Sequence, residues 1–146
     1  MLRFPANPPY FHLTIPSGRS GRLEVVLDAL DGDRCRRAQG RGAVQLPTTE
    51  PATIDVYLVQ QPFATCPLQI QLPASMQSQV LSENGEISCA GSCSRSVRKG
   101  TSHTLRVEPA DGEHFLGFRS PCVGTEPCPL TVNSPTTVQI AVVKSE

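Results

Sequence analysis

"HTLRVEPADGEHFLGF", residues 103–118, is the stretch of sequence that decides the fold of this chain. Its first half alternates apolar-phase positions with polar ones, His103, Leu105 and Val107 falling in one phase, and this two-residue period is typical of a β-strand. The Pro-Ala-Asp-Gly sequence at 109–112 predicts a turn, and a second strand follows it. Because the connections between the predicted strands of this chain are too short for helical crossovers, we expect a mostly antiparallel arrangement.

The same period recurs along the rest of the chain. It predicts further strands at 11–15, 22–30, 35–46, 52–60, 68–72 and 136–143. A tight turn is predicted at 31–33, and Gly40 and Gly42 suggest a bulge in the strand that follows it. Only residues 73–85 lack strong β character, and they are compatible with a loop, a hairpin or one helical turn.

Composition supports a mostly β protein with many turns. The chain has 146 residues, with 14 Pro and 11 Gly, which argue against long helices. We take the Pro-punctuated stretch at 60–67 as a boundary and predict two small antiparallel β modules. The first spans residues 1–66 and has the character of a β-sandwich, and the second spans residues 67–146.

Charge and hydropathy exclude some partners. The 13 basic and 13 acidic residues give a formal net charge of zero, so no global field favours nucleic acid. No apolar stretch is long enough to span a membrane. The opening "MLRFPANPPYF" lacks the apolar region of a signal peptide, so if the protein is exported, we expect its leader to be absent from this sequence.

Six cysteines are the strongest chemical signal in the sequence. An even number of cysteines in a small domain favours disulfides and an oxidising compartment, although six cysteines allow fifteen pairings. The alternative is a structural zinc site, for which the Cys89–Cys93 spacing is suitable but the wider Cys122–Cys128 spacing is not. The cysteines are Cys35, Cys66, Cys89, Cys93, Cys122 and Cys128.

Catalytic motifs are missing from the sequence. It has neither the G-x-S-x-G sequence of a serine nucleophile nor the H-E-x-x-H sequence of a zinc protease. We interpret the three histidines as ordinary strand or turn residues and predict neither catalytic residues nor a metal or other cofactor. They are His12, His103 and His114.

Two charged clusters flank the turn at 31–33. Its aspartates could bind calcium, but they lack the register of a calcium-binding loop. The arginines that follow could bind a polyanion, although a solvated strand face explains them more simply. The aspartates are Asp28, Asp31 and Asp33, and the arginines are Arg34, Arg36, Arg37 and Arg41.

Residues 85–143 resemble the divergent internalin-type B-repeat domain of bacterial surface proteins and lipoproteins. The shared elements come in order: a "GEISC" entry with a second cysteine, "KGTSHTLRVEPADG", "FLGF", "CVGTEPCPLTV" and a closing strand "TTVQIAVV". The family usually has Trp where Phe118 stands and Phe at the end of the last strand. These two departures suggest a smaller aromatic core. With strict alternation, Phe115 and Phe118 would lie on opposite faces of one strand, one in the core and the other as a cover.

The resemblance implies a β-grasp-like fold for residues 67–146 and a disulfide pairing. It implies that Cys89 pairs with Cys93 and Cys122 with Cys128, which leaves Cys35 and Cys66 as the third pair. No catalytic residue carries over from the family. The implied function is a non-enzymatic, extracytoplasmic module that serves adhesion, display or spacing at the cell surface, in the outer envelope or in the periplasm.

A partner of such a module would be a protein or glycan at the cell surface. The expected contact element is the loop closed by Cys122 and Cys128, because exposed loops commonly carry binding residues. Its residues are Val123, Gly124, Thr125, Glu126 and Pro127. Two other functions compete with this prediction: an intracellular β module stabilised by zinc, and a protease inhibitor that presents the same loop.

Overall fold

The computed structural model describes residues 14–47 and 53–145 and confirms the mostly β prediction. Ten strands and no helix lie in these ranges, so no helix there could cross a membrane. The strands are β1 (Gly21–Leu30), β2 (Arg36–Leu46), β3 (Val59–Gln71), β4 (Gln79–Ser82), β5 (Ser88–Ala90), β6 (Cys93–Arg98), β7 (Thr101–Glu108), β8 (Glu113–Ser120), β9 (Cys128–Val132) and β10 (Thr136–Lys144).

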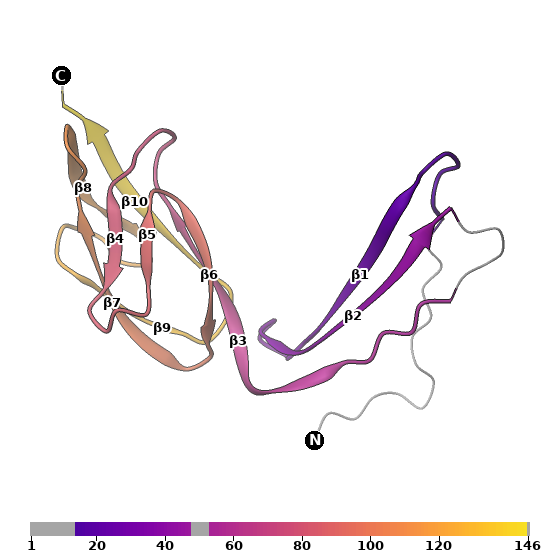
Figure 1. The fold of residues 1–146 in the computed structure, drawn as a ribbon. Coiled ribbons are helices and arrows are strands. Elements are labelled where there is room, and N and C mark those ends of the chain that lie inside the picture. The colour runs from indigo at the N-terminus through magenta and orange to yellow at the C-terminus, as the bar shows by residue number, and fades with distance from the viewer. Residues whose placement is uncertain (1–13, 48–52, 146) are drawn as a thin grey trace.

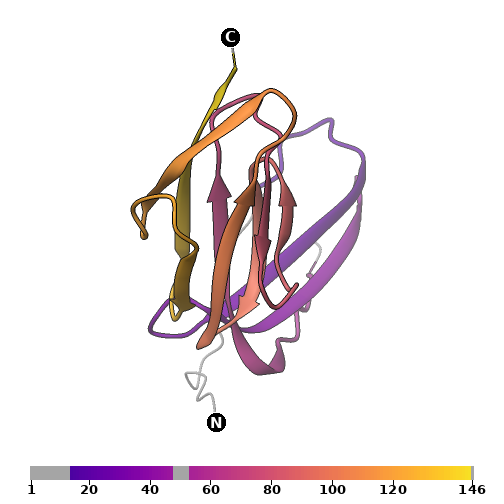
Figure 2. The same cartoon turned by 90° about the vertical axis from the view of Figure 1, so that its left-hand side faces the viewer.

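The strands form two sheets. One sheet has the order β1-β2-β3-β10-β8, with β6 also paired to β3, and the other has the order β5-β4-β7-β9. All pairs are antiparallel except β3 with β10, which is parallel. The β3-β10-β8 part of the first sheet, with β6, packs against the second sheet as a sandwich, and the β1–β2 hairpin projects to one side (Figure 1). Figure 2 shows the hairpin behind the two sheets of the sandwich.

The core lies between the two sheets of the sandwich. Alternate residues of facing strands fill it, including Leu68 and Ile70 of β3, Leu105 of β7 and Val138 of β10, each at most 1% exposed. Burial of each such side chain stabilises the fold by roughly 1.5–3 kcal/mol. The period-two pattern of the sequence is therefore the direct cause of this core.

Strand β3 joins the hairpin to the sandwich. Its first half pairs with β2 and its second half with β6 and β10, so it crosses the predicted boundary at residues 60–67 without a break. Residues 61–64 stand opposite Arg37 alone in an irregular stretch, where Pro62 has no N–H to donate. The division into modules at 66 and 67 stays a prediction, since part of residues 1–66 lies outside the described ranges.

The hairpin differs from the prediction in its pairing. The predicted strand at 52–60 is wrong for residues 53–58, which form no strand, although Ile54, Val56 and Leu58 keep their alternating half-burial. This segment lies over β2 at Gly40, where a Cβ would come within 2.5 Å of the Tyr57 carbonyl oxygen.

Gly40 and Gly42 of β2 therefore allow residues 53–58 to lie close against this strand. The predicted bulge at Gly40 and Gly42 is wrong, because the β1–β2 register is continuous there and shifts only between Ala29 and Leu30. The predicted strand at 11–15 lies mostly outside the described residues, and Thr14 and Ile15 are not in a strand.

Two segments of the sandwich, residues 73–85 and strand β8, can also be compared with their predictions. Residues 73–85 contain β4 and the turn of the β4–β5 hairpin, which was one of the open alternatives. The expectation that Phe115 and Phe118 lie on opposite faces is wrong, since their rings meet edge to face with centroids 5.3 Å apart. The register of β8 against β10 shifts between these residues, so one extra residue, Leu116, restores them to the same face. Phe118 is buried and Phe115 packs against the core.

Candidate functional site: a disulfide-bonded joint and an exposed loop

All six cysteines are in disulfides, as predicted. The pairs are Cys35–Cys66, Cys89–Cys93 and Cys122–Cys128, with Cα–Cα separations of 4.4, 6.0 and 5.6 Å. No cysteine is free, so none offers a thiolate to zinc. These are the pairs that the resemblance implies.

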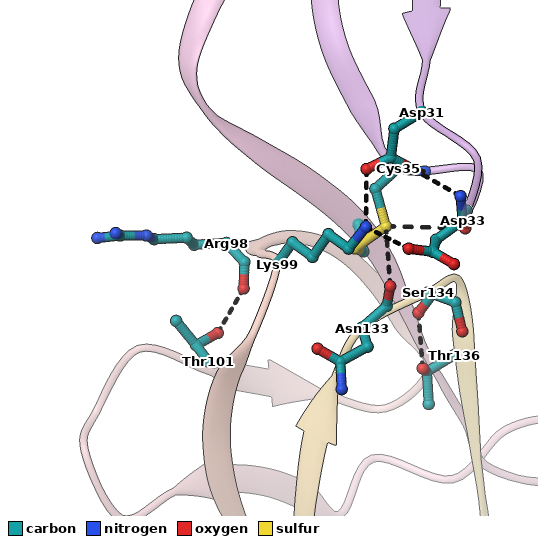
Figure 3. Close-up of a disulfide and its surroundings, with 10 residues drawn as sticks. Asp31, Asp33, Cys35, Arg98, Lys99, Thr101, Asn133, Ser134 and Thr136 are labelled. Atoms are coloured by element: carbon teal, nitrogen blue, oxygen red, sulfur yellow. Dashed lines mark hydrogen bonds and ion pairs between the residues drawn. A yellow bond between two sulfur atoms is a disulfide. The ribbon is translucent and has the colours of Figure 1, made fainter.

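The Cys35–Cys66 disulfide lies at the joint between the hairpin and the sandwich. Cys35 follows the β1–β2 turn and Cys66 is in β3, and both are fully buried in the main core. The Sγ of Cys35 is 3.5 Å from the carbonyl oxygen of Asn133, which lies in the β9–β10 turn (Figure 3). The disulfide therefore holds the hairpin turn against the sandwich core.

An ion-pair cluster reinforces this joint. Asp31 accepts hydrogen bonds from the N–H groups of Asp33 and Cys35, both at 2.9 Å, which orders the hairpin turn. Lys99, in the β6–β7 turn, donates its Nζ to Asp31 at 2.9 Å and also to Asp33 (Figure 3). The Lys99 N–H donates to the carbonyl of Ala64 at 2.9 Å. One lysine thus connects the hairpin turn, β3 and the sandwich.

The charges of the cluster are matched. The hydrogen bond from Lys99 lowers the pKa of the Asp31 carboxyl, with a further contribution from the Cys35 N–H. Hydrogen bonds to Asp31, then to Asp33, raise the pKa of the Lys99 ammonium. In place of the calcium site weighed above, these two carboxylates have a lysine partner, and the described residues contain no cluster suited to a metal ion.

The Cys89–Cys93 disulfide joins the two sheets at their edges. Cys89 is in β5 of the second sheet and Cys93 is in β6 of the first. Gly91 lies between them at a φ of +70°, and its N–H donates to the carbonyl of Ser78 at 3.0 Å. A glycine suits this turn, because other residues rarely adopt positive φ.

The loop predicted as a contact element is exposed. Every residue from Val123 to Pro127 is exposed, and Val123 reaches 86%. The loop is nevertheless fixed: Gly124 exchanges two backbone hydrogen bonds with Phe118 of β8, at 2.7 and 3.1 Å. The Cys122–Cys128 disulfide closes its base. The result is a rigid, solvent-facing loop with an apolar side chain at its first position.

The two histidines within the described residues lie in different environments. His103 is 3% exposed, with its Nε2 3.0 Å from Thr101 Oγ1 and its Nδ1 3.6 Å from a Glu86 carboxylate oxygen. His114 is exposed on β8, and His12 lies outside the described residues. His103 has no cysteine thiol beside it, since all six cysteines are in disulfides.

The four arginines of the cluster lie in three different environments. Arg41 is exposed beside Glu24, with a nitrogen-to-oxygen distance of 3.6 Å, as expected for a solvated strand face. Arg34 and Arg36 instead line a groove between the hairpin and β6. Arg37 is half-buried at the irregular β2–β3 pairing.

A buried carboxylate was missed by the sequence analysis. Glu113, 9% exposed, accepts hydrogen bonds from the Ser78 hydroxyl at 2.5 Å, the Gln77 N–H at 2.8 Å and the Ser78 N–H at 2.9 Å. These bonds, that of the Ser78 hydroxyl first, lower the pKa of the Glu113 carboxyl. The Glu113 carboxylate thus connects the start of β8 to Gln77 and Ser78, which directly precede β4. Lys99 was also missed, because no local pattern links it to a turn 68 residues earlier.

Comparison with protein-family models, curated proteins and solved structures gives no match to this chain.

Proposed function

We propose that this chain is a non-enzymatic, extracytoplasmic module of a bacterial surface or envelope protein that serves display, spacing or adhesion. The observation that carries the proposal is the pairing of all six cysteines in three disulfides. Such bonds persist in oxidising compartments and are rare in reducing ones. The resemblance of residues 85–143 to the B-repeat domain of surface proteins points the same way.

The arrangement of the disulfides suits a mechanically linked module. One bond fastens the hairpin to the sandwich, a second joins the two sheets, and the third closes the exposed loop. Strand β3 also passes from the hairpin into the sandwich without interruption. A chain crosslinked in this way can hold other parts of a protein apart, which supports a role in spacing.

The loop closed by Cys122 and Cys128 supports the adhesion role. Its residues face solvent, and its backbone is fixed by Gly124, so binding would require little ordering. Val123 is the side chain that we expect to contact a protein or glycan partner, because it is 86% exposed.

The test is the oxidation state of the protein in its own cells. Thiols are blocked with iodoacetamide during lysis, and the intact mass is measured before and after reduction in denaturant. We expect no alkylation before reduction and a mass lower than that of the reduced chain by two hydrogens for each of the three disulfides. Alkylated cysteines, or one zinc per chain by elemental analysis, would contradict the proposal and favour the intracellular zinc module.

A further inference from the structure

A groove of about 350 Å³ separates the hairpin from β6. Its floor is formed by Thr65 and Pro67 of β3, and β6 lines one side with Ser94, Arg95 and Ser96. Asp28, Leu30, Arg34 and Arg36 line the hairpin side. Its volume is at the small end of the range for ligand sites, which suits a small polar molecule.

Two polar atoms at this groove are buried without a partner. The Nε of Arg36 and the hydroxyl of Thr65 have no hydrogen-bond partner among the described residues. The two residues are opposite each other in the β2–β3 pairing, so their side chains lie on the same face of the sheet. Buried polar groups are nearly always hydrogen-bonded in folded proteins, so two neighbouring exceptions indicate that something else supplies the partner.

The chemistry of the groove is mixed rather than simply basic. Arg36 is 3.8 Å from a carboxylate oxygen of Asp28, and Arg34 has no ion-pair partner among the described residues. The hydroxyls of Ser94 and Ser96 add donors and acceptors, and Leu30 and Pro67 add apolar surface. Three guanidinium groups, those of Arg34, Arg36 and Arg95, and one carboxylate leave an excess positive charge.

We propose that this groove binds an acidic saccharide unit, that is, a sugar that carries a carboxylate or a sulfate. A small rotation of these two side chains would expose Arg36 Nε and the Thr65 hydroxyl, and the anionic group would accept hydrogen bonds from both. Arg34 and Arg95 would add further positive charge. Sugar hydroxyls would donate to Asp28 and pair with Ser96, and the apolar face of the ring would pack on Pro67. This surface differs from the loop at 122–128, and the inference goes beyond the proposed function without depending on it.

The Cys35–Cys66 disulfide constrains the backbone that carries two of the groove's side chains. Arg36 follows Cys35 in the chain and Thr65 precedes Cys66, so the disulfide fixes the backbone beside both orphan atoms. Lys99 holds the hairpin turn in place through its hydrogen bond to Asp31. A site whose backbone is fixed before binding, so that only side chains have to turn, loses less entropy when the ligand enters.

The experiment is an NMR titration of the isotope-labelled, oxidised chain. The probes are glucuronic acid and glucose 6-sulfate, with glucose and inorganic sulfate as comparisons. We expect saturable shifts of the Arg36 Nε–H signal and of the backbone amides of Thr65 and Ser96 with both acidic sugars. Glucose and inorganic sulfate should each bind about tenfold more weakly, because each lacks half of the contacts.

Three variants test the named atoms. Arg36→Gln should weaken binding of glucuronic acid about tenfold, and Arg36→Lys, which keeps the charge but lacks the Nε–H, should also weaken it. Thr65→Val, which keeps the shape but removes the hydroxyl, should weaken it about fivefold. Arg119→Gln is the matched control, since it removes the same charge from β8 at the far edge of the sheet.

Each variant is first checked for three disulfides and for cooperative thermal unfolding. The proposal is overturned if glucose binds as tightly as glucuronic acid, or if inorganic sulfate alone gives the same affinity. It is also overturned if the shifts lie outside the groove, or if Arg119→Gln weakens binding as much as Arg36→Gln. Because the titration uses the oxidised protein, its failure would leave the cellular oxidation test of the proposed function unaffected.

Discussion

Glu113 shows how one side chain can link distant parts of the sandwich. The residue begins β8, yet its carboxylate accepts hydrogen bonds from Gln77 and Ser78, which lie 35 or more positions earlier. A buried carboxylate is costly unless it is fully hydrogen-bonded, and three donors meet that need here. The sequence offers no local signal for this contact, because both partners lie in a segment with no clear pattern.

We expect Glu113 to make stability depend on acid pH. Hydrogen bonds lower the pKa of its carboxyl below the ordinary value of 4.5, so the unfolded state binds the proton more readily. The resulting stabilisation is present above the unfolded pKa and is lost as pH falls through the folded one. Urea unfolding between pH 3 and 7, about the range in which a carboxyl titrates, should show this fall in the free energy of unfolding.

The variant Glu113→Gln tests the source of that fall. It keeps the size of the side chain but replaces one acceptor oxygen by a donor that faces Ser78 or Gln77. The variant should be less stable at pH 7 and should depend less on acid pH. Glu126→Gln, in the exposed loop, is the control and should change neither. An equal loss of pH dependence in both variants would show that Glu113 is not the group responsible.

At the scale of elements, β8 and the loop at 122–128 form one unit. Gly117, at a φ of +131°, lies in the irregular part of β8, and the carbonyl oxygen of Gly124 approaches it closely. A Cβ at Gly117 would be 2.9 Å from that oxygen. The glycine therefore allows the loop to pack on the strand and form its two hydrogen bonds to Phe118.

Gly117→Ala should detach this loop. The backbone conformation is strained for any residue with a Cβ, and the clash with Gly124 adds to it, so we expect the free energy of unfolding to fall by about 2–3 kcal/mol. Gly112→Ala is the matched control: its φ is also positive, at +72°, but a Cβ there meets nothing within 4 Å. It should cost only about 1 kcal/mol.

Urea unfolding of both glycine variants measures these losses, and the amide shift of Gly124 reports on the loop. If Gly117→Ala leaves that shift unchanged, the close approach between the strand and the loop is not required. If both variants lose the same stability, the positive φ alone explains the cost.

The same elements show what the sequence can and cannot predict. Alternation identified β7 and β10, which bury alternate residues of the core over part of their length. It did not indicate β9, whose alternate residues are also buried but whose strand has only five residues. It failed for Phe115 and Phe118, because the extra residue in β8 is defined only by its register against β10. It also failed for residues 53–58, which alternate but hydrogen-bond to no strand. Register and pairing are non-local, so a single segment does not contain them.

In the candidate site, too, the sequence predicted what one segment indicates and missed what depends on distant contacts. The cysteines were identified from their number, and the loop at 122–128 from its position between two of them. The ion pairs of Lys99 and the orphan atoms of Arg36 and Thr65 depend on three segments meeting at the joint. No pattern within any one of those segments indicates the others.

At the scale of the whole molecule, the hairpin depends on the sandwich. In the described residues the sandwich core buries large side chains completely, whereas the apolar residues of β1 are half-buried or, as for Val26 and Leu30, exposed. A two-stranded hairpin alone is marginally stable in water. The hairpin is held by its pairing with β3, by Lys99 and by the Cys35–Cys66 disulfide.

Removing that disulfide should release the hairpin while the sandwich stays folded. The bond closes a sequence separation of 31, for which loop-closure entropy predicts about 3.5 kcal/mol of stabilisation. In the variant Cys35→Ala/Cys66→Ala, hydrogen exchange should become fast in β1 and β2 and remain slow in β7 and β10. Small-angle scattering should show a larger radius of gyration, because the released hairpin would extend from the sandwich.

The variant Cys122→Ala/Cys128→Ala is the control for this experiment. It also removes one disulfide, but the bond closes a separation of only 6 and contributes about 2 kcal/mol. Its loop is remote from the joint, so exchange in β1 and β2 should stay slow. If the Cys35→Ala/Cys66→Ala variant loses protection in the hairpin and the sandwich together, the two parts unfold as one cooperative unit. In that case the ion pairs and the β2–β3 pairing, rather than the disulfide, hold the hairpin to the core.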